Sequence, residues 1–121
     1  MSRGAESVDR IFALDERIRY VAVLDSRHKL LESKMRTGIL SFTEAEKDRK
    51  FMGSAPPIIL DVLSQLEKDC GNLQLVTVQY EKVSLILFRL GNRMVILSVE
   101  PDSIREVVQS ISEGLGLRLG S

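Results

Sequence analysis

The chain has 121 residues, enough for one domain, and its 44% hydrophobic and 28% charged residues are typical of a globular protein. Seventeen basic residues balance seventeen acidic ones, and this zero net charge argues against nucleic acid or an anionic membrane as a partner. The single cysteine, Cys70, excludes an intrachain disulfide and a multi-cysteine zinc site.

The first part of the chain predicts a helix and then two strands. Val8, Ile11 and Phe12 recur at helical spacing. Residues 18–24 alternate in polarity and are rich in β-branched side chains, which predicts a strand. A polar turn follows, and residues 29–35 predict a second strand, paired with the first as a hairpin but with weaker alternation.

Residues 36–57 are expected to form an insert in the middle helical region. Thr43 and Glu46 make a capping-box pattern ahead of a short charged helix that stops at Gly53. Pro56 and the proline after it suit the first turn of a further helix. The apolar stripe of that helix comprises Ile59, Val62, Leu63 and Leu66.

Three strands are predicted next, at residues 73–80, 83–90 and 93–100. Gly91 and Asn92 join the last two as a two-residue hairpin loop. The second and third strands are apolar on both faces, which is typical of the middle of a sheet that is covered on both sides.

A last helix, capped by Asp102 or Ser103, has the most regular apolar repeat of the chain, at Ile104, Val107, Val108, Ile111 and Leu115. Ser103 and Glu106 predict a capping box at its start. Residues 114–121 are expected to be a frayed tail. The fold class is therefore α+β, in the order α-β-β-α-β-β-β-α, with an antiparallel sheet of about five strands and flanking helices.

No segment resembles a signal peptide or approaches the roughly 18 apolar residues of a membrane span. We therefore expect a cytoplasmic protein with a single domain over residues 1–121 and no membrane insertion.

Asp25, Ser26 and His28 are the side-chain types of a hydrolase triad, but they are nearly adjacent in sequence. A tight turn projects neighbouring side chains in divergent directions, whereas a triad needs them to converge. Asp and Ser are also favoured in turns, because they hydrogen-bond to nearby backbone. His28 is the only histidine and has too few carboxylate neighbours to predict a metal site. We predict no catalytic, cofactor-binding or metal-binding residue.

The strand at residues 73–80 begins the three-strand meander and could lie at an edge of the sheet. An uncovered apolar edge invites pairing with another chain, and a symmetric dimer is the default closed form of such pairing. Six positions are the candidates for a dimer interface: Leu75, Val76 and Val78 in the strand, with Ile59, Val62 and Leu63 in the preceding helix.

Two stretches, YVAVLDSRHKLLES and LQLVTVQYEKVSLILFRLGNRMVILSVEPDSI, resemble the Roadblock-type dynein light chain family, within the profilin-like and longin-like architectures. The chain also looks like uncharacterised archaeal roadblock-like proteins. His28 stands where the family usually has glycine, and the insert is longer than the single helix expected there. The resemblance implies a non-catalytic homodimer or heterodimer that scaffolds a signalling or motility complex or regulates a small GTPase.

Two other classes of function stay open on the sequence. A small-ligand sensory domain would have a polar pocket between the sheet and the helices of residues 43–69, where Arg19, Arg36 and Tyr80 could face an anion. An enzyme is disfavoured, because the sequence offers no acid–base pair or nucleophile in a suitable context.

Overall fold

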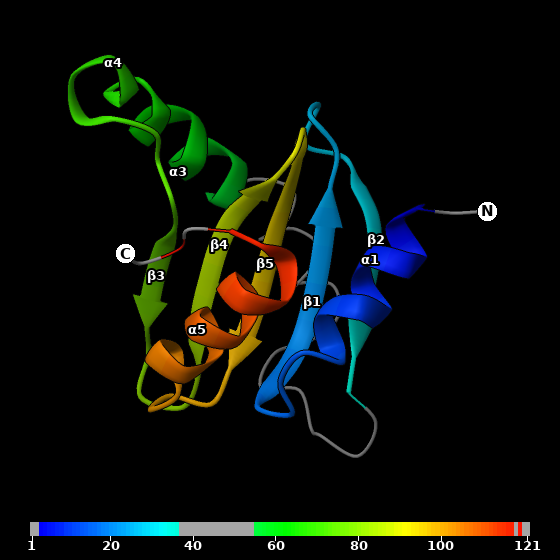
Figure 1. The fold of residues 1–121 in the computed structure, drawn as a ribbon. Helices are drawn as coiled ribbons and strands as arrows, with labels where there is room; N and C mark the ends of the chain where they lie inside the picture. Colours follow the sequence, from blue (N-terminus) through cyan, green and yellow to red (C-terminus); the bar gives the residue numbers. More distant parts are fainter. Residues whose placement is uncertain (1–2, 37–54, 118, 120–121) are drawn as a thin grey trace.

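The computed structural model describes residues 3–36, 55–117 and 119, and the predicted capping box at Thr43 and Glu46 with its charged helix lies outside these residues. Five antiparallel strands form one sheet in the order β2-β1-β5-β4-β3 (Figure 1). The strands are β1 (Ile18–Leu24), β2 (Leu30–Met35), β3 (Val76–Gln79), β4 (Ser84–Leu90) and β5 (Arg93–Val99). The helices are α1 (Arg3–Phe12), α3 (Ala55–Ser64), the short α4 (Glu67–Cys70) and α5 (Ile104–Leu115).

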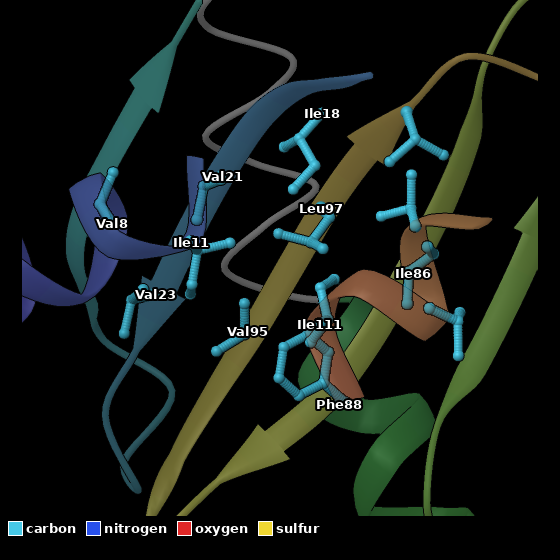
Figure 2. Close-up of a cluster of buried hydrophobic side chains, with 13 residues drawn as sticks. Val8, Ile11, Ile18, Val21, Val23, Ile86, Phe88, Val95, Leu97 and Ile111 are labelled. Atoms are coloured by element: carbon cyan, nitrogen blue, oxygen red, sulfur yellow. The ribbon is translucent and has the colours of Figure 1, made fainter. Parts of the chain in front are cut away.

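Helices α1 and α5 cover one face of the sheet (Figure 1). Figure 2 shows how Ile11 from α1 and Ile111 from α5 meet the side chains of the central strands. The cluster includes Phe88 and Leu97, which are fully buried. Burying a side chain of this size stabilises the fold by about 1.5–3 kcal/mol, so this cluster is the main core.

The opposite face of the sheet carries a second, smaller apolar cluster. Ala22, Leu87 and Ile96 project to this side, and Leu60 of α3 packs onto them. The central strands therefore bury side chains on both faces, as their continuous apolar sequences predict.

The turn between β1 and β2 is held together by Asp25, as the turn interpretation predicts. The Asp25 carboxylate accepts the backbone N–H groups of Arg27 at 2.8 Å and Lys29 at 3.0 Å. The N–H of Lys29, followed by that of Arg27, accordingly lowers the pKa of this carboxyl group. His28 adopts a positive φ of 66° in this turn, a conformation that favours glycine.

Four details differ from the sequence expectations. β3 spans four residues where eight were predicted, and α4 is an additional single turn. The Ser103 hydroxyl makes no capping hydrogen bond and instead donates to the carbonyl of Glu100 at 2.7 Å, so the predicted capping box with Glu106 was wrong. Gly114 and Leu115 belong to α5 and not to a frayed tail.

Arg36 fixes the end of α1 to the start of β1. Its guanidinium donates to the carbonyls of Ile18 at 2.7 Å, Phe12 at 3.0 Å and Asp15 at 3.1 Å. It also lies over the Phe12 ring, 4.8 Å from the centroid. A planar fork can bridge several acceptors in this way, which a lysine ammonium does less well.

Replacing Arg36 with Met is expected to lower the free energy of unfolding by about 2–3 kcal/mol, because three carbonyls lose a charged donor. Urea denaturation at fixed protein concentration measures this difference. Arg36→Lys should recover only part of the loss. A loss below about 0.5 kcal/mol for Arg36→Met would place this residue with ordinary surface positions.

Candidate interaction surface

The outer face of α3 is apolar and exposed. Ile58 is 60% exposed, Val62 55%, Leu63 40% and Leu66, two residues beyond the helix, 56%. Ile58, Val62 and Leu66 follow one another at four-residue intervals, so they lie along one side of the helical turn. Scattered exposed leucines are ordinary, but a contiguous apolar stripe marks an interaction surface.

Polar contacts hold the second half of α3 and the start of α4 beside the sheet. Nε2 of His28, in the β1–β2 turn, lies 3.2 Å from Oδ2 of Asp61. Arg89 of β4 donates to the hydroxyl of Ser64, and its guanidinium lies 3.3 Å from Oε1 of Glu67 in α4. Leu60 lies in the same half of α3 and is fully buried, so this part of the helix packs on the sheet.

Glu67 also organises the segment that leads from α4 to β3. Its Oε2 accepts the backbone N–H of Leu73 at 2.8 Å, and this bond, followed by the contact with Arg89, lowers the pKa of the carboxyl group. A groove of about 450 Å³ lies beside this segment, lined by residues that include Leu63, Leu66 and Leu75. The groove therefore joins the exposed face of α3 to the start of β3.

β3 is an edge strand, as predicted. The N–H of Tyr80 donates to the carbonyl of Val83 at 2.9 Å, which makes this a hydrogen-bonded pair. Thr77 and Gln79 lie opposite Ile86 and Ser84 in the same ladder. Hydrogen-bonded and non-hydrogen-bonded pairs alternate in an antiparallel ladder. The backbone N–H and C=O groups of Thr77 and Gln79 therefore point away from β4, toward the open edge.

Comparison with solved structures identifies the architecture. The gliding protein MglB from Thermus thermophilus matches with a TM-score of 0.64 at 15% identity, over 93% of this chain and 85% of that one. An MglB with a tetrameric arrangement matches with a TM-score of 0.68 at 14% identity, over 93% and 82%. A Roadblock/LC7 domain from Streptomyces avermitilis matches with a TM-score of 0.56 at 9% identity, over 88% and 95%.

The fold is of the roadblock type. The predicted α+β fold class is thereby confirmed. At these identities the likeness concerns the fold alone. No protein-family model and no curated protein matched the chain. The resemblance to archaeal roadblock-like proteins stays a prediction.

In this roadblock fold the six predicted interface positions fall on two faces of the sheet. Ile59 is half-buried, whereas Val62 and Leu63 are exposed on α3. Val76 and Val78 are half-buried and pack with the cluster on the α3 side. Leu75 packs with the main core on the opposite side.

The six predicted interface positions leave out two exposed residues. Ile58 and Leu66 are more exposed than any of the six. Leu66 already belonged to the predicted apolar stripe, and Ile58 lies four residues before Val62, which was the signal that could have added it to the same surface.

Two members of the predicted anion-binding set, Arg19 and Arg36, already donate to backbone carbonyls. The Arg36 guanidinium donates hydrogen bonds to three carbonyls, as described above. Arg19 donates to the carbonyl of Lys82 at 3.2 Å. It also lines a groove of about 370 Å³, where Arg17 is the second cation and Glu100, Asp102 and Glu106 supply three carboxylates. The acidic groups outnumber the basic ones there, which disfavours an anion.

Asp15 is the buried carboxylate of the described residues. Its side chain is 4% exposed and forms a bidentate ion pair with Arg17. Oδ1 lies 2.9 Å from Nε, and Oδ2 lies 3.0 Å from a terminal guanidinium nitrogen. The hydroxyl of Ser110 donates to Oδ2 at 2.8 Å. The hydrogen bonds from the Arg17 side chain are the largest cause of a pKa lowered to about 2. This arrangement ties the α1–β1 connection to α5.

Within residues 3–36, 55–117 and 119, no three His, Cys, Asp or Glu side chains gather closely enough to hold a metal ion. None of the helices described is both long enough and apolar enough to cross a membrane.

Proposed function

We propose that this protein is a non-catalytic homodimeric interaction module. The observation that carries the proposal is the apolar face of α3, exposed over Ile58, Val62, Leu63 and Leu66, beside an open sheet edge at β3. Both features cost solubility in a monomer, and one contact between two copies covers both.

The proposed dimer is symmetric, with β3 of one copy antiparallel to β3 of the other. A pairing centred on Val78 sets Thr77 opposite Gln79 of the second copy. The outward N–H and C=O groups of both strands then bond to each other. In the same register, Tyr80, which is 53% exposed, lies opposite Val76 of the second copy and covers it.

The dimer is proposed to scaffold a signalling or motility complex or to regulate a small GTPase. The support is the resemblance to the roadblock family, together with fold neighbours named as a gliding protein and as a tetrameric arrangement. Both names describe assembly or motility, and neither describes a reaction.

The solution mass across a dilution series tests the dimer. Light scattering is expected to give about twice the chain mass of 13.6 kDa and to keep that value down to micromolar concentration. A mass equal to one chain at every concentration would overturn the homodimer. It would favour the small-ligand sensor, which a thermal-shift screen of metabolites would then address.

Binding to the small GTPases of the source cell tests the regulatory part separately. Each GTPase is loaded with GDP or with a non-hydrolysable GTP analogue and passed over the immobilised protein. Binding that depends on the nucleotide supports GTPase regulation. If no GTPase binds in either nucleotide state, the proposed GTPase regulation is contradicted, whereas the proposed dimer is unaffected.

A further inference from the structure

A second groove lies on the face of the sheet opposite α3. It has a volume of about 510 Å³ and lies between α5 and the start of β3. Four of its eight lining residues are polar or charged, and the other four are the apolar Leu75, Ile104, Val108 and Leu119. Leu75 immediately precedes β3, so this groove opens at the same sheet edge as the surface of α3.

The segment after α5 forms part of the wall of this groove, through Leu119. Gly116 ends the helix with a left-handed φ of 66°, and the N–H of Leu117 donates to the carbonyl of Ser112 at 2.9 Å. Leu115, Leu117 and Leu119 recur at every second position, and all three are half-buried against the main core. The chain leaves α5 and runs toward β3 (Figure 1).

The polar attachment of this segment is weak. The Ser112 hydroxyl lies 2.8 Å from the carbonyl of Val108 and 3.2 Å from the carbonyl of Leu119. A hydroxyl has a single proton, so it donates fully to only one of these carbonyls at a time. The segment is therefore held mainly by its leucines, which keep part of their apolar surface in solvent.

We propose that Leu117 and Leu119 of each copy contact the second copy, so that the dimer interface has two layers. This inference rests on the proposed dimer. Helix α3 covers the joined β3 strands on one face, and the leucine segment covers their junction on the other. The occupant of the groove mouth is a second copy of this chain, because the groove is continuous with the β3 edge at Leu75.

Hydrogen exchange at several protein concentrations tests this directly on the unmodified chain. Peptides covering residues 113–121 are expected to exchange several-fold more slowly above the dimer dissociation constant than below it, in step with peptides that cover β3. Peptides that cover β2, at the far edge of the sheet, should not change. An unchanged exchange rate for residues 113–121 while β3 gains protection would overturn the inference.

Substitution supplies the second measurement. Leu119→Asp should raise the dimer dissociation constant about tenfold, since a charge would enter an apolar contact. Leu31→Asp is the matched control, because Leu31 is an exposed leucine on β2 at 41%, and it should change the constant less than twofold.

Different results would contradict the proposed function and the two-layer interface. A dimer that Leu119→Asp leaves as tight as the wild type keeps the proposed function and removes only the two-layer interface. A wild-type chain that is monomeric at every concentration removes both.

Discussion

The double substitution Val62→Asp with Leu66→Asp is expected to convert the proposed dimer into a monomer, with a dissociation constant raised by at least about a hundredfold. Each copy would place two carboxylates on the apolar face of α3, and the symmetry would bring four of them into one contact. Apolar burial would be lost and like charges would repel, which costs far more than either change alone. Sedimentation across a dilution series measures the constant.

The same two substitutions should leave the isolated chain folded. Val62 and Leu66 are 55% and 56% exposed, so aspartate there meets solvent in the monomer. Surface changes of this kind alter the free energy of unfolding by about 0.5 kcal/mol. Leu31→Asp serves again as the control. A double variant that stays dimeric with native affinity would show that α3 is not the contact surface.

Asp15→Asn is expected to lower the free energy of unfolding by about 2 kcal/mol at neutral pH. The hydrogen bonds and charge of Arg17 hold the folded-state pKa of Asp15 at about 2, against a usual value of 3.8. A lowered pKa means that the folded state favours the charged carboxylate. Its contribution is complete well above pH 3.8 and disappears as the pH falls through about 2.

The pH profile separates this ion pair from others. The stability difference between wild type and Asp15→Asn should be constant from pH 7 to about pH 5 and then close as the pH falls toward 2. Asp9→Asn is the matched control. Asp9 contacts Lys34 at 2.8 Å, but both side chains are more than half exposed, so its loss should cost less than about 1 kcal/mol. A stability difference between wild type and Asp15→Asn that does not change with pH would contradict the assigned pKa.

Much of the fold could be predicted because its strands differ in hydrophobic pattern. The sequences of β4 and β5 are apolar at consecutive positions, which suits only strands covered on both faces. The strand that became β3 was predicted to be a possible edge strand, and it lies at an edge. The edge position of β2 was not predicted. The length of β3 could not be read from that pattern, because Leu73 and Leu75 continue the alternation before the strand begins.

The interaction surface was predictable only in part. An apolar stripe at helical spacing does not say whether it faces the core or a second chain. In α3, Leu60 took the buried position, which turned Val62 and Leu66 outward. The contacts that accompany this orientation, Asp61 with His28 and Arg89 with Ser64, join residues far apart in the sequence, so no local pattern predicts them.

The two edges of the sheet are not equivalent, and this bears on how far assembly can proceed. α1 packs against β2, and Lys34 of that strand is paired with Asp9 of the helix. The β1–β2 ladder is also irregular between Val23 and Leu24, which disturbs any continuation of the sheet on that side. A sheet that can accept a strand from another chain at one edge only stops growing once one further chain has paired with it. The fold thus permits pairing while blocking the endless strand-by-strand growth that leads to fibres.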